Sequence, residues 1–151
     1  DRLGFVVTES TEWNGEACHF LRCGTDHHSL ALYPMGLRSE LGLTDWSNSF
    51  SFGVRLNDYR QLKDAISWLE EKGVEVRYFP TELFPGMDYT AFAIDPDGHA
   101  IQLYCYMEQI GWDGRPRPAD QRPQVDNENW PETIEAHSDS FGGEPFMGPW
   151  G

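Results

Sequence analysis

Residues 49–107 constrain the fold more than any other stretch, because their pattern changes from strand to helix and then back to strand. Alternate positions are apolar over residues 50–56, which predicts a strand with one buried face. Asn57 and Asp58 offer N-cap oxygens for a helix over residues 59–72. The apolar residues of that helix recur at positions i, i+3, i+4 and i+7 and form one stripe: Leu62, Ala65, Ile66 and Leu69.

Three strands are predicted after this helix, which Gly73 ends in a left-handed conformation. They cover residues 74–79, 89–94 and 99–107. The turn between the last two, residues 95–98, reads DPDG. Its proline and glycine suit a type I turn, so we expect these two strands to form a hairpin. The order of elements is therefore βαβββ, and the fold class is α+β.

Two motifs add a family resemblance to this pattern. Residues 91–104 read AFAIDPDGHAIQLY, and together with the βαβββ order they resemble the closing half of a vicinal oxygen chelate domain. That superfamily contains glyoxalases, bleomycin-resistance proteins and extradiol ring-cleavage dioxygenases. Residues 20–32 read FLRCGTDHHSLAL, which is a more specific motif and resembles the extradiol branch. The resemblance covers residues 3–107 and implies paired βαβββ modules.

The same resemblance divides the chain. It implies a domain over residues 1–110, made of a partial module 1–34, a linker 35–48 and a full module 49–107. Residues 3–7 resemble the strand that follows the helix of the first module, so a strand and a helix are expected before them. We expect those elements to have been cleaved, to be disordered, or to be supplied by another chain. The expected partner is accordingly a second copy of the chain or a companion N-terminal segment.

The tail, residues 111–151, is rich in proline, glycine and acidic residues and shows no sustained periodicity. Residues 120–125 and 130–136 are candidates for one short helix. Disordered tails are usually poor in aromatic residues, so we expect this tail to pack on the domain; a lid or a subunit contact is the alternative. Five aromatic residues lead to this prediction: Trp112, Trp130, Phe141, Phe146 and Trp150.

Composition excludes several classes of partner. The formal net charge of −14 over 151 residues argues against binding to nucleic acid or to an anionic membrane surface, because both require clustered cations. No apolar run approaches the roughly 20 residues that span a bilayer. Cys18, Cys23 and Cys105 lack CxxC spacing, so we expect reduced thiols in a cytoplasmic protein rather than disulfides or a zinc site.

Extradiol enzymes hold Fe(II) with two histidines and one glutamate, and the resemblance places one catalytic residue of that family in this chain. His28 matches the acid–base histidine, and a neutral imidazole there could accept a phenol proton and return it. The alternative is a strand histidine bonded to a neighbouring backbone group. His27 is expected on the opposite face of the strand, outside the cavity.

The expected metal ligands are replaced in this sequence. Asn48 and Ser49 stand where the family has its second histidine, and Gln102 stands where it has the glutamate. Phe92 occupies the position of the catalytic tyrosine, which removes a phenol donor. No metal ligand is therefore assigned. The resemblance implies Fe(II) or another divalent metal only if residues outside this chain complete the site.

What remains is a predicted cavity for a small aromatic ligand, with His28 at its rim. Gln102 and Asn48 can each donate and accept, so they could recognise a hydroxyl or carbonyl group without a metal. The candidate substrate-binding residues are Asn48, Ser49, Phe50, Phe52, Phe92, Gln102 and Tyr104.

Three functions are compatible with these residues. The first is an extradiol-type ring-cleavage enzyme whose Fe(II) site is completed elsewhere. The second is a relative with a degenerate metal site that binds or transforms a catechol-like compound, with His28 as proton shuttle. The third is a non-catalytic binding domain of the bleomycin-resistance type, or a scaffold module within a larger dioxygenase. We favour a dioxygenase-like domain with a degenerate metal site.

Overall fold

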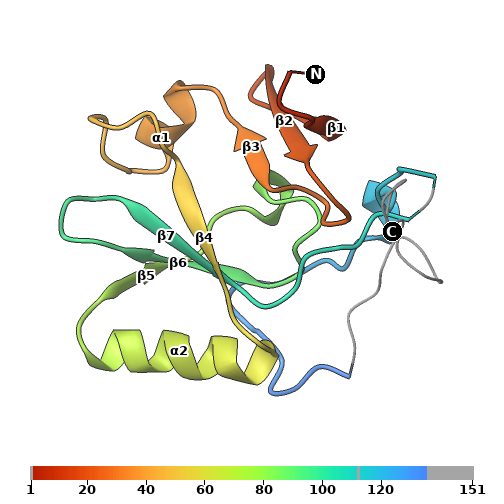
Figure 1. The fold of residues 1–151 in the computed structure, drawn as a ribbon. Helices are drawn as coiled ribbons and strands as arrows, with labels where there is room; N and C mark the ends of the chain where they lie inside the picture. Colours follow the sequence, from red (N-terminus) through yellow and green to blue (C-terminus); the bar gives the residue numbers. More distant parts are fainter. Residues whose placement is uncertain (1, 112, 136–151) are drawn as a thin grey trace.

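The computed structural model describes residues 2–111 and 113–135, which form two sheets and one long helix (Figure 1). The first sheet has the order β1-β2-β3, and its strands are Val6–Trp13, Glu16–Arg22 and Leu30–Leu32. All of its strand pairs are antiparallel. Asn14 and Gly15, with φ of 50° and 82°, form the tight turn between β1 and β2 that the Asn-Gly pair favours.

The second sheet has the order β4-β7-β6-β5 and confirms the βαβββ order predicted for residues 49–107. Its elements in chain order are β4 (Ser51–Arg55), α2 (Tyr59–Glu71), β5 (Glu75–Arg77), β6 (Thr90–Ile94) and β7 (Ala100–Tyr104). Strand β4 runs parallel to β7, while β7 and β6 form the predicted hairpin. The order β5-β6-β7 repeats the order β1-β2-β3, in agreement with paired modules.

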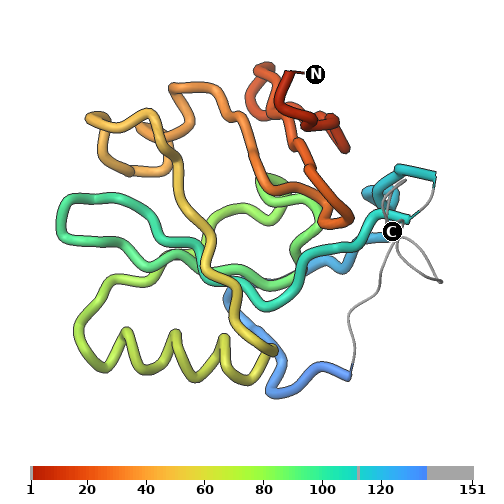
Figure 2. Tube along the Cα trace, viewed as in Figure 1, coloured from red at the N-terminus to blue at the C-terminus, as the bar shows by residue number. Residues whose placement is uncertain are grey.

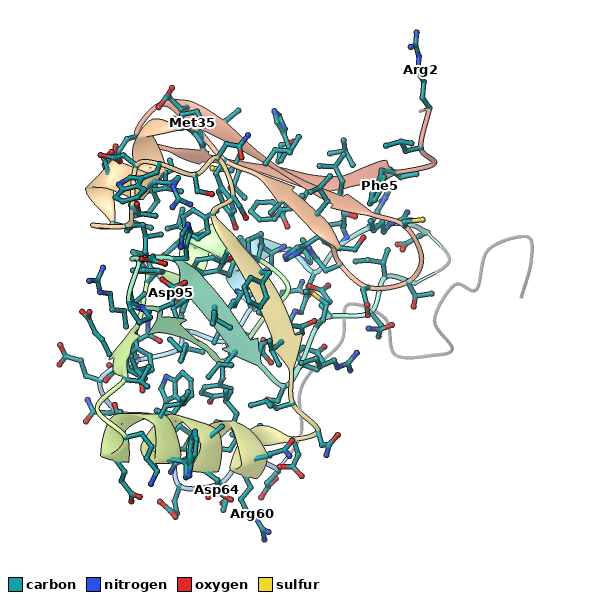
Figure 3. The ribbon with its side chains drawn as sticks, turned by 60° about the vertical axis from the view of Figure 1, so that its left-hand side comes forward. Arg2, Phe5, Met35, Arg60, Asp64 and Asp95 are labelled. Carbon is teal, nitrogen blue, oxygen red and sulfur yellow. The ribbon has the colours of Figure 1, made fainter. Side chains whose placement is uncertain are left out.

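The local signals for α2 act as predicted. The side chain of Asp58 accepts a hydrogen bond from the backbone N–H of Gln61 at 2.8 Å and so caps the first turn. Gly73, with φ of +77°, follows the last turn. Leu62 and Ile66 are buried against the sheet, whereas Arg60 and Asp64 point away from it (Figure 3).

Helix α2 covers one face of the four-stranded sheet, and the three-stranded sheet lies on its other side (Figure 2). Two clusters of buried residues follow from this layering. One lies between α2 and the sheet and includes Leu62, Ala91 and Leu103. The other lies between the two sheets and is rich in aromatic rings, among them Phe84 and Phe92.

The linker, residues 35–48, contains the helical turn α1 (Gly36–Glu40). Arg38 of α1 is buried and binds the chain that follows it. Its guanidinium donates to the carbonyl oxygens of Thr44 and Ser49. These bonds fix the backbone just before β4, where the sequence places two candidate site residues.

The described part of the tail contacts the domain at several points. Asn127 donates to the carbonyl oxygen of Phe79, and the hydroxyl of Tyr59 donates to that of Pro131. Trp130 packs against the rings of Tyr59, Tyr78 and Tyr89.

The short helix predicted in this tail is not observed over residues 130–135. A 3₁₀ turn occurs at η2 (Ala119–Gln121), while residues 130–135 follow the surface of the domain through bends. Trp130 and Pro131 are held there by contacts with α2 and with the rings of Tyr78 and Tyr89 rather than by bonds within a helix. Four residues of the tail prediction, Trp112, Phe141, Phe146 and Trp150, lie outside the described residues, as does Ala136.

None of the helices in the described ranges combines the length and the apolar character that crossing a membrane requires. The other 3₁₀ turn, η1 (Thr81–Leu83), follows β5, and its Leu83 is buried in the cluster between the sheets.

Candidate functional site

A cavity of about 520 Å³ lies where β3 and β4 face each other across the two sheets. Seven of the eight residues predicted for the site line it: His28, Asn48, Ser49, Phe50, Phe52, Gln102 and Tyr104. They come from the loop before β3, the end of the linker, β4 and β7. Residues separated by more than seventy positions in the chain therefore meet at one place.

Phe92 is the exception, and the expectation that it faces the cavity is corrected. Its side chain is 0% exposed and is not among the residues that line the cavity. Its ring lies 4.6 Å from that of Phe79 and 4.8 Å from that of Phe84, measured between centroids. Phe92 therefore belongs to the aromatic core between the sheets.

Phe52 lies at the mouth of the cavity rather than inside it, since it is 60% exposed. The face of β4 that points inward carries Ser51 and Gly53, which alternate with Phe52 along the strand. A Cβ atom on Gly53 would lie 3.0 Å from Cε1 of Tyr104, so Gly53 lies on the same face of the sheet as Tyr104. Ser51 is on the same face of β4 and lines the cavity, although no pattern in the sequence marks it as a site residue.

Gln102 projects from the centre of β7 and is only 7% exposed. Its Nε2 lies 3.2 Å from Sδ of Met87, a weak acceptor that lines the same cavity. A Cβ atom on Gly53 would lie 3.7 Å from Oε1 of Gln102, so the amide oxygen is on the β4 side. Gln102 thus offers the cavity a hydrogen-bond acceptor.

Apolar and aromatic side chains form the rest of the wall. The ring of Phe50 lies 4.7 Å from that of Tyr33, whose hydroxyl donates to the carbonyl oxygen of Leu83 at 2.7 Å. That bond directs the hydroxyl away from the cavity. Burial raises the pKa of Tyr33, and to a smaller degree burial also raises the pKa of Tyr104, so both phenols stay protonated near neutral pH.

His28 is 9% exposed and lines the cavity, with its ring edge-on to that of Phe20 at a centroid distance of 5.1 Å. The pKa of His28 is lowered to about 3, chiefly by burial and to a smaller degree by the neighbouring His27, while Glu9 acts in the opposite direction. The imidazole of His28 is therefore neutral at physiological pH. A neutral ring can accept or donate one hydrogen bond at each nitrogen, according to its tautomer.

His27 does not line the cavity, as expected, and its side chain is fully buried. Its Nδ1 lies 3.1 Å from Nδ1 of His28, and its Nε2 lies 3.0 Å from Oε2 of Glu9. Arg122 contacts both carboxylate oxygens of Glu9, at 3.1 and 2.6 Å. A continuous series of polar groups thus leads from Arg122 through Glu9 and His27 to His28.

Backbone features position this series. The pairing of β1 with β2 shifts register between Val7 and Glu9, and such a bulge redirects the following side chain. Gly86, with φ of +85°, lies flat against the ring of His27 and leaves no room for a Cβ atom. Burial would raise the pKa of Glu9, but its hydrogen bonds with His27 and Arg122 hold it below the ordinary value.

Only part of this arrangement could be predicted from the sequence. The pair of adjacent histidines stood out, and His27 was expected outside the cavity, where the structure has it, but its burial against Glu9 was not predicted. Residues 26–29 form an irregular loop before β3, so alternation does not apply there. No local pattern marks Glu9 or Arg122 as partners of His27.

The donors that this chain brings to the cavity do not fit Fe(II). Two histidines and a carboxylate would be needed, whereas the family positions on β7 and before β4 hold amide and hydroxyl groups. The amide nitrogen of Gln102 donates to sulfur instead of leaving both ends free. Among the described residues, no group of three His, Cys, Asp or Glu side chains is arranged to hold a metal ion.

Two other cavities lie away from His28. One, of about 430 Å³, adjoins the start of α2 and is lined by Tyr59, Cys105 and Ile134. The other, of about 220 Å³, lies beside Arg117 and Arg122. We assign the candidate site to the cavity between the sheets because it alone of the three contains His28 and Gln102.

Comparison with known proteins agrees with this architecture. Residues 1–103 match the Glyoxalase/Bleomycin resistance protein/Dioxygenase superfamily. A search of curated proteins gave no match. The matched region includes the first sheet, α2, Gln102 and all of the second sheet except Tyr104. The chain therefore belongs to the Glyoxalase/Bleomycin resistance protein/Dioxygenase superfamily.

Proposed function

We propose that this chain is an extradiol-dioxygenase-like domain with a degenerate metal site, which binds a small oxygenated aromatic compound of the catechol type in the cavity between its sheets. The observation that carries the proposal is that His28, the match to the family's acid–base histidine, and Gln102 line one cavity of about 520 Å³. Cavities for small molecules typically measure about 300–1,000 Å³ and combine apolar walls with a few polar groups.

The chemistry of the wall supports an aromatic ligand. Phe50 and Tyr104 offer ring surfaces for stacking or edge contacts with an aromatic ring. Gln102 and His28 offer polar atoms for the hydroxyl groups of a catechol. Asn48 and Ser49, both exposed at the rim, are proposed to contact the ligand at its open side.

The low pKa of His28 favours a second candidate function. An imidazole whose pKa is about 3 is a weak general base for a phenol near neutral pH, because effective general bases have pKa values close to the working pH. Binding without turnover, as in the bleomycin-resistance branch, would need only the hydrogen-bonding role of His28. The two candidates differ in whether a bound catechol is chemically changed.

Titration of the protein with catechol, followed by calorimetry and by tryptophan fluorescence, tests binding. His28→Ala is expected to weaken binding by about tenfold, the loss of one hydrogen bond in a closed site. His19→Ala is the matched control, because His19 is an exposed residue of β2 that bonds Ser10 outside the cavity. Equal affinity of wild type and His28→Ala would refute the assignment of the site.

Oxygen uptake and product analysis in the presence of catechol then separate binding from turnover. Unchanged catechol supports the non-catalytic candidate. A chemically altered catechol, formed by wild type but not by His28→Ala, supports a transforming enzyme. Ring-opened product that requires added Fe(II) would contradict the degenerate metal site and restore ring cleavage.

A further inference from the structure

The hydrogen bonds of the series Arg122–Glu9–His27–His28 constrain which ring nitrogen of His28 carries the proton. A carboxylate can only accept hydrogen bonds, so Nε2 of His27, 3.0 Å from Oε2 of Glu9, must carry a hydrogen. The contact between the two Nδ1 atoms, at 3.1 Å, needs one hydrogen between them. That hydrogen belongs to His28 if His27 is neutral and to His27 if His27 is a cation.

Burial and the local charge balance favour a neutral His27. Its side chain is 0% exposed, and its carboxylate partner is already neutralised by two contacts with Arg122. A protonated His27 would add a second buried cation beside one anion, which costs free energy without a further partner. With His27 neutral, its Nδ1 accepts, and Nδ1 of His28 must donate to it.

We propose that Glu9, acting through His27, is a positioning residue that holds the proton of His28 on Nδ1 and thereby presents Nε2 of His28 to the cavity as a hydrogen-bond acceptor. Among the described residues, the ring of His28 makes its hydrogen bond through Nδ1, and His28 lines the cavity, which leaves Nε2 for a ligand. The inference deepens the proposed function, since it defines what a ligand must offer at this point. It must bring a hydroxyl that donates, as a phenol does, and an aryl ether does not meet this requirement.

The tautomers can be read directly by two-dimensional ¹H–¹⁵N correlation NMR of the full chain labelled with ¹⁵N-histidine, at pH 7 and without ligand. The expected spectrum shows His28 protonated at Nδ1 and His27 protonated at Nε2. Single substitutions of the other histidines, such as His19→Ala and His99→Ala, assign the signals. A spectrum in which His28 carries its proton on Nε2, or in which His27 carries two protons, would overturn the inference.

Glu9→Gln tests whether Glu9 is the cause. The single amide oxygen of a glutamine would be taken by Arg122, which leaves the amide N–H to donate to Nε2 of His27. His27 would then carry its proton on Nδ1, and the proton of His28 would move to Nε2. Glu12→Gln is the matched control, because Glu12 is an exposed acid on the same strand and makes the same change of charge. A folded Glu9→Gln protein with His28 still protonated on Nδ1 would show that Glu9 does not set the tautomer.

Ligand selectivity gives a second readout. Wild type is expected to prefer catechol over its dimethyl ether by about tenfold or more, and Glu9→Gln is expected to reduce this ratio toward one, because Nε2 becomes a donor. A ratio unchanged by Glu9→Gln would count against the inference. If Glu9→Gln fails to fold, the tautomer of wild-type His28 still decides. Because that measurement needs no ligand, failure of catechol to bind refutes the proposed function and leaves the tautomer result intact.

Discussion

The amide Nε2 of Gln102 lies 3.2 Å from Sδ of Met87, so a thioether orients the side chain that the family resemblance places at the glutamate position. A carboxylate could not make this contact, because it has no hydrogen to donate to sulfur. The exchange of glutamate for glutamine and the presence of Met87 therefore form one consistent local arrangement. It leaves the oxygen of Gln102 toward β4, where a ligand hydroxyl can reach it.

Gln102→Glu is expected to destabilise the protein by about 1–3 kcal/mol at pH 7, since it buries a carboxylate against Met87 without a donor. The cost arises from the ionised form, so burial should raise the pKa of the new carboxyl group. The loss of stability should then shrink as the pH falls and the group becomes protonated. Denaturant unfolding at pH 7 and pH 5 measures both effects. Gln124→Glu, at an exposed position, should change stability little; an equal loss in both variants would contradict the argument.

Phe92→Ala is expected to lower the free energy of unfolding by about 3–5 kcal/mol, because it removes a fully buried ring from the aromatic core. Phe52→Ala is the comparison, and its 60% exposed side chain predicts a change within about 0.5 kcal/mol. Chemical denaturation of the three proteins measures the difference. Similar losses in the two variants would show that Phe92 does not have the core role assigned to it.

Gly53→Ala is expected to weaken catechol binding while leaving the fold intact. The added methyl group would lie 3.0 Å from Cε1 of Tyr104 and would displace that ring into the cavity or away from it. Because a side chain and not the backbone is displaced, the loss of stability should stay near 1 kcal/mol, in the lower part of the range for added core volume. Gly36→Ala, where no atom lies within 4 Å of the new Cβ, is the control for both stability and binding.

His28 makes the stability of the protein depend on pH. Its folded pKa of about 3 lies well below its ordinary value of 6.5, chiefly because of burial. Between these two values the unfolded chain binds a proton that the folded protein does not. The contribution of His28 to the free energy of unfolding is therefore complete above pH 6.5 and is lost as the pH falls. The free energy of unfolding lost through His28 is at most about 1.4 kcal/mol for each pH unit.

Denaturant unfolding from pH 7 to pH 4 measures this dependence. His28→Phe should show a shallower loss of stability toward acid than wild type, whereas His19→Ala should keep the wild-type slope. Parallel curves for wild type and His28→Phe would contradict the low pKa of His28. Glu9, whose pKa is held down by its hydrogen bonds, adds a further acid-sensitive contribution that appears only as the pH falls below the ordinary glutamate range.

The amino-acid sequence by itself determined the elements of the second module. The stripe through Leu62 and Ile66, the cap at Asp58 and the DPDG turn are local signals, and each depends on residues within a few positions of one another. The family resemblance placed Gln102 and Tyr104 of β7 at the cavity, and both line it.

Only the tertiary structure decided which faces and which distant residues meet. Alternation gives a strand two faces but does not say what covers each residue. Phe92 pairs with Gln102 and shares its face of the sheet, but the rings of Phe79 and Phe84 cover it, so it belongs to the core. The series from Arg122 through Glu9 to His27 joins residues 113 positions apart, and it forms because the tail returns to β1 beside the loop that carries His27 and His28. Contacts of this kind depend on the packing of whole elements, which no local pattern encodes.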